Sequence, residues 1–412
     1  MSWKKKYEEN WGQLGMKSEW KIMKLSDIAL FNPRESIKKG QLAKKIAMDK
    51  LQPFNRDVPE FSIEEFKGGT KFRNGDTLMA RITPCLENGK IAKVNILDED
   101  EIGFGSTEYI VFRAIENLSD PDYLYYLVCS PIVRDVAIKS MVGSSGRQRV
   151  QTDVVENIEI AVPTLIEQRK IGKLLSSIDD KIAINSRINN NLEQQIEALL
   201  QQLINDDNTS EVALGDYLYI KGRIGWKGLK KSEYLSKSGY RIINGETLTK
   251  SGIDWNKAGY ISSERYEESP EIMLKVSDIL LSKDGTIGKI GYVDSLDLPT
   301  SVASGIFVIR NNQPNIVSTT FIYYLLKSQL FKAFIAARTE GSVIPHLYQK
   351  DFMEFKFPLS ASDKMMTFEE IAGPMFSQII SNLNENKKLT SLRDVILPKL
   401  MSGELDVSEI DI

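Results

Sequence analysis

A run of helix-forming residues occurs twice in this chain, at a constant separation, and this repeat constrains the fold more than any other feature. Residues 166–204 contain no proline, and their apolar residues recur at alternating steps of four and three, as in a coiled coil. The same spacing returns 197 residues later, since 382 − 185 and 386 − 189 give the same difference for a pair of asparagines. The predicted seam residues are Ile178, Ile182, Asn185, Asn189, Leu192 and Ile196 in the first helix, and Met375, Ile379, Asn382, Asn386, Leu389 and Ile396 in the second.

The segments that precede the two helices also match, in the same order. VALGDYLYI (212–220) follows the pattern of MKLSDIALF (23–31), and residues 341–358 follow that of residues 143–163, with Gly341 opposite Gly143 and 345–347 opposite 147–149. Two unrelated amphipathic helices can align by chance, but chance does not explain the matched asparagines and flanking segments. An internal duplication is therefore the better interpretation.

The duplication predicts an α+β protein in which two similar mixed α/β domains are separated by two long antiparallel helices, related by a pseudo-two-fold axis. In that register Asn185 meets Asn386 and Asn189 meets Asn382, and these amides would fix the helix alignment. Ile184 and Ile188 offer an alternative seam, in which the asparagines face solvent. The predicted boundaries are a lead-in at 1–20, a first domain at 21–164, a helix at 165–205, a second domain at 206–360, a helix at 361–405 and a tail at 406–412.

Composition limits the classes of protein and of site. The chain has 412 residues, 42% hydrophobic and 26% charged, as in ordinary globular proteins of two or three domains, and its net charge of −3 argues against coating DNA by bulk charge. Two cysteines, Cys85 and Cys129, and one histidine, His346, are too few for the usual metal sites. No apolar run is long enough for a membrane span and no signal peptide is evident, so we expect a cytoplasmic protein. The lead-in, with Trp3, Trp11 and Trp20, is either a frayed terminus or a docking segment for a partner.

Motifs for chemistry are missing from the sequence. We find no Walker A motif, no adenine-methyltransferase motif and no paired-carboxylate nuclease core, and SKDGTIGKIG (282–291) has hairpin rather than phosphate-loop spacing. We therefore expect a chain that is non-catalytic by itself and holds no cofactor and no metal. A helical scaffold that binds only proteins, and a stand-alone DNA-modifying enzyme, remain as alternatives.

The module order and several motifs resemble the specificity subunit of type I DNA restriction-modification systems. The motifs are RITPCLENGK (81–90), IEQRKIGKLLSSIDDK (166–181), SKDGTIGKIGYV (282–293) and LPKLMSGEL (397–405). The resemblance implies that each domain reads one half of a bipartite double-stranded DNA target and that the helices set the gap. It also implies docking of two methyltransferase subunits, with two restriction/translocase subunits in the full complex, and those partners would use S-adenosylmethionine, ATP and Mg²⁺.

Candidate DNA-binding residues lie in basic, polar and glycine-containing segments, because arginine can fork onto guanine, glutamine onto adenine, and glycine loops can approach phosphate. These segments can instead be ordinary solvated loops, Trp226 can be a core anchor, and His346 can be a structural residue of its turn. The first-domain candidates are Arg34, Lys38, Lys39, Arg81, Thr83, Asn88, Lys90, Ser144, Ser145, Arg147, Gln148 and Arg149. Those of the second domain are Arg223, Trp226, Lys227, Arg241, Asn244, Lys283, Asp284, Thr286, Arg338, Ser342, His346 and Tyr348.

Overall fold

The computed structural model describes residues 19–144, 146–223, 228–249, 252–339 and 346–410. The chain divides into two compact units. Unit 1 comprises Met1–Ala183 together with Asn386–Ile412, and unit 2 comprises Ile184–Glu385. No helix in the described ranges is both long and apolar enough to cross a lipid bilayer.

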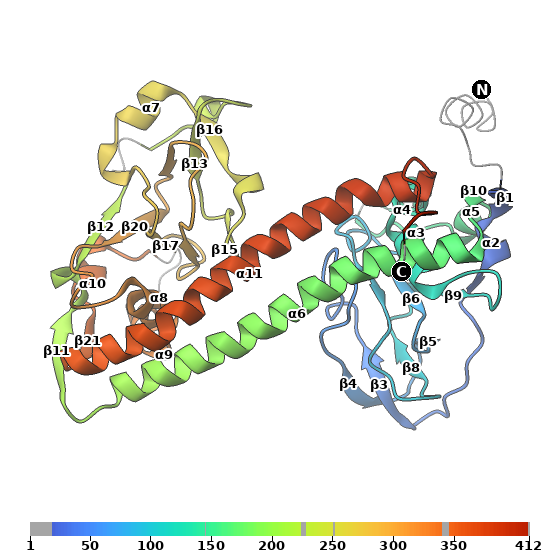
Figure 1. Cartoon of the computed structure of the whole chain (residues 1–412), viewed down its shortest axis with the longest axis horizontal. Helices are drawn as coiled ribbons and strands as arrows, with labels where there is room; N and C mark the ends of the chain where they lie inside the picture. The colour runs from blue at the N-terminus through green and yellow to red at the C-terminus, as the bar shows by residue number, and fades with distance from the viewer. Residues whose placement is uncertain (1–18, 145, 224–227, 250–251, 340–345, 411–412) are drawn as a thin grey trace. The chain divides into compact units, whose positions relative to one another are not determined.

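The globular part of unit 1 is a mixed fold of short strands and short helices (Figure 1). Its helix α3 begins after Asp120, because that side chain accepts hydrogen bonds from the backbone N–H groups of Asp122 and Tyr123, and a proline occupies the first helical position. In chain order the elements are β1 (Lys21–Lys24), α2 (Leu25–Ile28), β2 (Ala29–Phe31), β3 (Leu42–Ile46), β4 (Ser62–Glu65), β5 (Thr70–Phe72), β6 (Thr77–Ala80), β7 (Ile91–Lys93), β8 (Gly103–Gly105), β9 (Tyr109–Ala114), α3 (Pro121–Cys129), α4 (Pro131–Lys139), α5 (Thr152–Glu156) and β10 (Glu159–Val162).

A four-stranded antiparallel sheet, in the order β2-β9-β6-β7, forms the centre of unit 1. Successive residues of a strand face opposite sides of the sheet, and both sides of this sheet are covered. Ile110 and Phe112 pack in the core that contains α3 and α4, whereas Leu78 and Val111 pack in a second core with Phe72 of the β4-β3-β8-β5 sheet. Burial of both faces explains why β6 and β9 are almost continuously apolar.

Unit 2 repeats this plan, which confirms the predicted duplication and fold class. Its central sheet has the order β12-β20-β17-β18, which matches β2-β9-β6-β7 strand for strand, and its second sheet, β16-β13-β19, is smaller. The predicted hairpin at 282–291 connects β17 to β18. The elements are β11 (Thr209–Ala213), η1 (Leu214–Asp216), β12 (Leu218–Gly222), η3 (Lys231–Glu233), β13 (Tyr240–Ile243), β14 (Leu248–Thr249), β15 (Gly252–Ile253), η4 (Trp255–Lys257), β16 (Gly259–Ile261), α7 (Ser263–Glu267), η5 (Pro270–Ile272), β17 (Ile279–Ser282), β18 (Ile290–Tyr292), β19 (Thr300–Val302), β20 (Ile306–Asn311), α8 (Thr319–Lys327), α9 (Gln329–Thr339), α10 (Gln349–Met353) and β21 (Lys356–Ser360).

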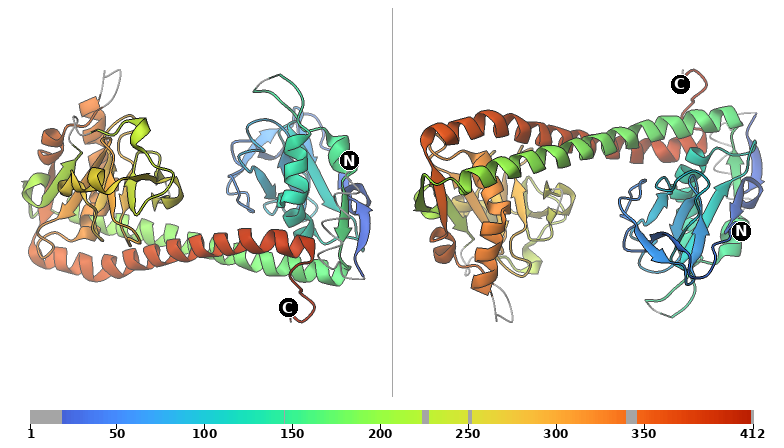
Figure 2. Two further views of the ribbon diagram at one scale, coloured as in Figure 1. Left: turned by 90° about the horizontal axis from the view of Figure 1, so that it is seen from above. Right: turned by 90° about the horizontal axis from the view of Figure 1, so that it is seen from below.

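The two long helices are α6 (Leu165–Ile204) and α11 (Ser362–Ser402), and each contributes a stretch to both units. Within each unit, the stretch of α6 lies beside that of α11 and runs in the opposite direction (Figures 1 and 2). In unit 1, Arg393 donates to Asp179 at 2.7 Å, and in unit 2 Asn382 donates to Asn189 at 2.8 Å. Both helices therefore bury a face against the globular part of each unit as well as against one another.

The asparagines of the seam are buried, as the first of the two seams requires. Asn185 and Asn189 are 1% and 6% exposed, whereas Ile184 and Ile188 are 49% and 42% exposed, so the alternative seam is not the one that forms. The pairing is also duplicated: Asn189 donates to the carbonyl of Ile379, and Asn386 donates to the carbonyl of Ile182, each at 3.4 Å.

The amide contact predicted between Asn189 and Asn382 is present. Asn185 donates to Glu385 at 2.7 Å. The contact predicted between Asn185 and Asn386 stays a prediction, because these two residues belong to different units.

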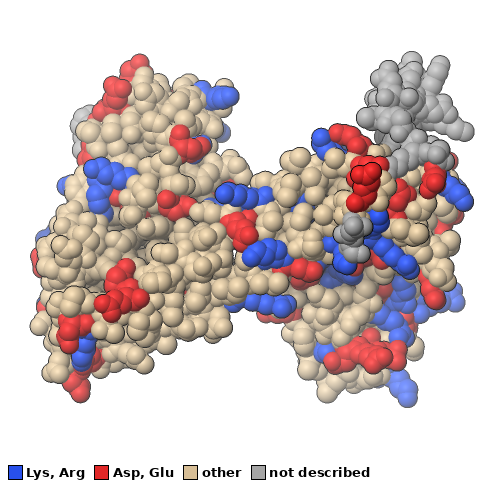
Figure 3. Space-filling model, in the orientation of Figure 1, with Lys and Arg blue, Asp and Glu red and all other residues tan. Residues whose placement is uncertain are grey.

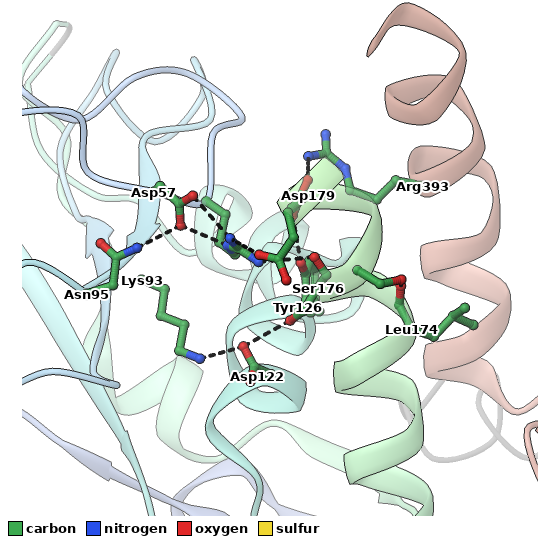
Figure 4. Close-up of polar contacts among 12 residues, drawn as sticks. Asp57, Lys93, Asn95, Asp122, Tyr126, Leu174, Ser176, Asp179 and Arg393 are labelled. Carbon is green, nitrogen blue, oxygen red and sulfur yellow. Dashed lines mark hydrogen bonds and ion pairs between the residues drawn. The ribbon is translucent and has the colours of Figure 1, made fainter. Parts of the chain in front are cut away.

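A buried polar junction joins the globular part of unit 1 to both of its helix stretches (Figure 4). The hydroxyl of Tyr126, on α3, donates to Asp179 of α6 at 2.6 Å, and the same carboxylate accepts from Arg393 of α11 at 2.7 Å. Nearby, Ser176 donates to Asp122 at 3.0 Å. Burial and the adjacent Asp179 raise the pKa of Tyr126 far above its usual range, so its hydroxyl remains a donor.

The folded part of unit 1 extends beyond the predicted domain boundaries at both ends. Trp20 is 5% exposed, its indole N–H donates to Glu167, and it lies against Gly403, so it belongs to the folded unit rather than to a lead-in. Val407 is 1% exposed and packs in the main core, so the predicted tail also contributes to folding. Both corrections have one cause: apolar side chains near the termini cover the first turns of α6 and the last turns of α11. Trp3 and Trp11 lie outside the described residues.

Candidate nucleic-acid interface

Two segments that are distant in the sequence of unit 1 pair to form a polar edge, which we call the unit-1 lip and define as residues 81–83 and 147–150. Arg149 forms antiparallel bridges with Ile82 and with Val142. The N–H of Val150 donates to the carbonyl of Arg81 at 2.8 Å, and the N–H of Thr83 donates to the carbonyl of Gln148 at 3.0 Å. The first segment continues directly from β6, so the central sheet positions it. The lip brings together five of the predicted residues, which are Arg81, Thr83, Arg147, Gln148 and Arg149.

Glu108 holds the side chain of Arg149 within this lip. Its two carboxylate oxygens accept from Nε of Arg149 at 3.0 Å, and one of them also accepts from Nη2 at 2.7 Å, while Nε of Arg81 lies 3.9 Å away. These cations, Arg149 above all, lower the pKa of Glu108, so the carboxylate stays charged. Sequence reasoning missed Glu108, since it lies just before β9 and reaches the lip only when β9 pairs with β6.

Unit 2 contains the same construction, the unit-2 lip, which consists of residues 283–284 and 346–347. The N–H of Leu347 donates to the carbonyl of Lys283 at 2.9 Å, as that of Val150 does to Arg81 in unit 1. Likewise, the N–H of Lys283 donates to the carbonyl of Gly305 at 2.9 Å, matching the 2.9 Å bond from Arg81 to Glu108.

These hydrogen bonds correct the alignment made from the sequence. They place Leu347 opposite Val150, with a difference of 347 − 150 = 197, so His346 is the counterpart of Arg149 rather than of Gln148. Of the two glycines that suggested the other register, Gly143 lies in a turn, where a shift of one residue leaves no mark on apolar periodicity, and Gly341 lies outside the described residues. The separation of 197 therefore holds for the second segment of each lip as well as for the long helices, whereas the first segments are 283 − 81 = 202 residues apart.

A carboxylate also contacts His346 of the unit-2 lip, although this carboxylate comes from a position that differs from that of Glu108. The imidazole Nδ1 of His346 contacts Oδ1 of Asp284, and the rings of His346 and Tyr348 lie 4.5 Å apart. Gly305 occupies the position of Glu108 and offers no side chain. The ammonium of Lys283 lies 5.0 Å from the ring centre of Phe307. The two lips therefore share a backbone frame and differ in the side chains that they present.

Other candidates of the first domain lie outside the unit-1 lip. Arg34, Lys38 and Lys39 are exposed on the connection from β2 to β3, and Asn88 is exposed in the turn after β6. Lys90 donates through Nζ to the carbonyl of Met48 at 2.8 Å, so its charge points inward.

The turn that carries the Gly/Ser motif leads into the lip. Ser144 is exposed there and its carbonyl accepts from the N–H of Arg147 at 3.0 Å. Gly143 (φ 134°) has a backbone conformation that L side chains rarely adopt, and a Cβ there would lie 2.9 Å from the carbonyl oxygen of Arg147. This turn therefore requires glycine at position 143. Ser145 lies outside the described residues.

Two arginines predicted to contact DNA in the second domain are internal. Arg223 is 2% exposed and donates to the carbonyl of Val302 at 3.1 Å and to two serine hydroxyls, and burial lowers its pKa. Arg241 is 9% exposed and forms a bidentate pair with Asp297 at 2.6 and 3.1 Å. Arg223 directly follows β12 and Arg241 lies on β13, and both guanidinium groups are directed into the unit, so neither faces a ligand on the surface.

The remaining candidates of the second domain are scattered. Asn244 accepts hydrogen bonds from the N–H groups of the turn that follows it, and Thr286 is exposed in the β17–β18 hairpin. Arg338 pairs with Asp351 at 3.1 Å. Trp226, Lys227 and Ser342 lie outside the described residues.

Charges of both signs are mixed on the face of each unit drawn in Figure 3. A ligand that carries phosphates would therefore be recognised by local groups rather than by a broad positive field. Within the described ranges, no cluster of three or more histidine, cysteine, aspartate or glutamate side chains could hold a metal ion.

Comparisons with known proteins agree on one family. A family model described as type I restriction modification DNA specificity domain matches the chain twice, over residues 17–194 and 207–390. The specificity subunit of the type I restriction enzyme MjaVIII of Methanocaldococcus jannaschii is 22% identical over 75% of this chain and 76% of its own length. The EcoAI specificity subunit of Escherichia coli is 24% identical over 82% of this chain and 74% of its own length.

One solved structure shows the same fold. The crystal structure of the type I restriction-modification S subunit from M. genitalium superposes with a TM-score of 0.58 at 16% identity, and the match covers 92% of this chain and 96% of that one.

Proposed function

Because this chain belongs to the type I restriction modification DNA specificity domain family, we propose that it is the subunit that reads DNA sequence for a type I restriction-modification complex. Each unit reads one half of a bipartite double-stranded target. The helices α6 and α11 set the number of unspecified base pairs between the halves. This extends the family assignment to a mode of action for this chain.

The observation that carries the proposal is the pair of lips. Both have the same backbone frame, but the unit-1 lip presents Arg147, Gln148 and Arg149, and the unit-2 lip presents Lys283 and His346. A duplicated frame with different polar side chains suits two readers of different base sequences. Base edges are distinguished by donors and acceptors on such side chains, whereas phosphates carry no sequence information.

The chemistry of the complex belongs to its partners in this proposal. The chain docks two methyltransferase subunits, and two restriction/translocase subunits join in the full assembly. S-adenosylmethionine, ATP and Mg²⁺ are used by those subunits, and this chain is non-catalytic by itself. The names of the relatives, which are specificity subunits of type I restriction enzymes, support this division of labour. A complex that modifies the genome would act in the cytoplasm.

Mapping of methylated adenines in the host genome tests the proposal. The expected result is one two-part motif with a fixed gap, lost when the gene for this chain is deleted and restored when it is returned. Purified complex of this chain with its methyltransferase should then retain a duplex carrying the motif and release one in which either half is scrambled.

The two alternatives predict different results. A helical scaffold that binds only proteins would retain the two duplexes equally. A stand-alone enzyme would transfer methyl groups or cleave DNA when the chain is assayed without partners. Either result would overturn the proposal.

A further inference from the structure

The unit-1 lip presents one arginine in a geometry suited to reading a base. The backbone of Arg149 is held on both sides, since its N–H and carbonyl bond to Val142 at 2.9 and 3.0 Å, and it also bridges to Ile82. The Cα of this residue is therefore fixed by the sheet extension rather than carried on a free loop. A side chain that starts from a fixed backbone loses less freedom on binding, which favours specific contacts.

Glu108 is itself fixed. Its N–H donates to the hydroxyl of Ser106 at 3.1 Å, and its carbonyl accepts from the N–H of Arg81 at 2.9 Å. The Glu108 side chain is 24% exposed, whereas that of Arg149 is 48% exposed. The carboxylate therefore lies beneath the guanidinium, and the guanidinium faces solvent.

The hydrogen bonds between them use one edge of the guanidinium. Glu108 accepts from Nε and Nη2, and Nη1 has no hydrogen-bond partner in the parts of the chain that the structure describes. The edge formed by Nη1 and the second hydrogen of Nη2 remains available. That edge matches the O6 and N7 acceptors of guanine in the major groove, which is the commonest bidentate contact of arginine with a base.

We propose that Arg149 reads a guanine in the half-site contacted by unit 1, and that Glu108 is the positioning residue that orients it. This inference rests on the proposed function and adds the base that is read. The recurrence in unit 2 supports it, because there a different carboxylate, that of Asp284, contacts the residue at the position of Arg149. A carboxylate held against the reading residue is thus a feature of both lips.

Removing the charge of Glu108 distinguishes two roles for Arg149, which are contact with a base and contact with phosphate. If Arg149 only contacted phosphate, the nearby carboxylate would repel the DNA, and Glu108→Gln would tighten binding to every duplex. If Arg149 reads guanine, the same substitution frees its side chain and weakens discrimination at one base pair. Immobilising such a side chain costs about 0.5–1.5 kcal/mol, which corresponds to a two- to tenfold loss.

The experiment measures equilibrium binding of the full chain, in complex with its methyltransferase, to the mapped target and to duplexes in which each G·C pair of the unit-1 half is replaced by A·T. The variants are Glu108→Gln, Arg149→Lys and Arg149→Ala. The matched control is Glu64→Gln, which removes another surface ion pair of unit 1, the 2.9 Å contact with Lys45.

We expect Arg149→Ala and Arg149→Lys to reduce discrimination at one G·C pair by about 5- to 150-fold, the value of a bidentate base contact. Arg149→Lys keeps the charge, so its binding to non-specific DNA should be unchanged. Glu108→Gln should lose about two- to tenfold at the same pair with equal or tighter non-specific binding, and Glu64→Gln should match the wild type.

Two results would overturn the inference while leaving the proposed function intact. One is full discrimination at every base pair by Glu108→Gln. The other is an equal loss of affinity for all duplexes by Arg149→Ala, which would make this residue a phosphate contact. Equal binding of the wild-type complex to target and scrambled duplexes would instead remove the proposed function.

Discussion

An Asp179→Ala substitution leaves the guanidinium of Arg393 in a buried site without the carboxylate that holds it. The side chains of Asp179 and Arg393 are 6% and 11% exposed and lie 2.7 Å apart. Removing one partner of a buried ion pair typically costs about 3–5 kcal/mol, because the remaining charge keeps its desolvation penalty. Arg393 also contacts Asp394 at 2.9 Å, on a side that water reaches, so we expect the lower end, about 3 kcal/mol.

Unit 2 provides the design of the matching control. Phe376 and Ile196 are buried at the corresponding positions, since 376 − 179 and 393 − 196 both equal 197. A variant with Asp179→Phe and Arg393→Ile copies this apolar solution, and Tyr126→Phe removes the hydroxyl that would lose its acceptor. Replacing a buried ion pair by packed apolar residues is often neutral or stabilising. We therefore expect the triple variant to recover most of the stability lost by Asp179→Ala.

Urea unfolding of the isolated chain, followed by far-ultraviolet circular dichroism, measures both effects. Since two units contribute to the signal, the transitions of wild type and variants should be fitted with a separate step for each unit. A loss below about 1 kcal/mol for Asp179→Ala, which is the range of exposed pairs, would refute the reasoning that this junction is buried and tightly coupled.

Three further perturbations concern the length of the long helices, the Glu35 carboxylate and the buried Arg223. Inserting seven residues at equivalent points of both α6 and α11 lengthens each helix by about 10.5 Å. Because one base pair rises by about 3.4 Å, the gap in the methylation motif should grow by about three base pairs. An unchanged gap would show that the helices do not set it. The contact with Arg73 holds the pKa of Glu35 below its ordinary value, so Glu35 stabilises the fold above its unfolded-state pKa and loses this contribution as pH falls through the lower folded-state value. Thermal melts between pH 6 and 3 should therefore fall less steeply for Glu35→Gln than for the wild type. Arg223→Met should destabilise the chain by about 1–3 kcal/mol, the cost of leaving buried acceptors unsatisfied, yet leave the salt dependence of DNA binding unchanged, and a smaller salt slope would show that Arg223 contacts phosphate.

The duplication and the helices could be predicted because apolar spacing is a local property of the sequence. Steps of four and three between Ile178 and Ile196 predict a buried apolar stripe on the first long helix, whatever that stripe packs against. The repeat of the same stripe in the second long helix predicts that the two helices pack against each other. The contact of Asn189 with Asn382 followed from the same arithmetic.

The site was less predictable, since it is built from tertiary pairing. Arg223 and Arg241 have no local feature that distinguishes them from exposed arginines, and the structure alone shows their internal acceptors. Glu108 joins the unit-1 lip only through the pairing of β9 with β6, and the alignment of the lips shifted by one residue in a loop without periodicity. Charge and glycine content pointed to residues 147–149, which the structure places in the unit-1 lip, but not to Glu108, which accepts hydrogen bonds from Arg149.

The assignment of the last residues of the chain to the same unit as the first ones has a consequence for synthesis. Leu397, Leu400, Met401 and Val407 complete the main core of unit 1, so the ribosome must synthesise these residues before that core can close. Unit 2 is continuous from Ile184 to Glu385 and becomes complete earlier, which reverses the usual order in which the amino-terminal domain folds first. A stop codon after residue 390 of this sequence should therefore damage unit 1, whose other segment is translated first, while sparing unit 2.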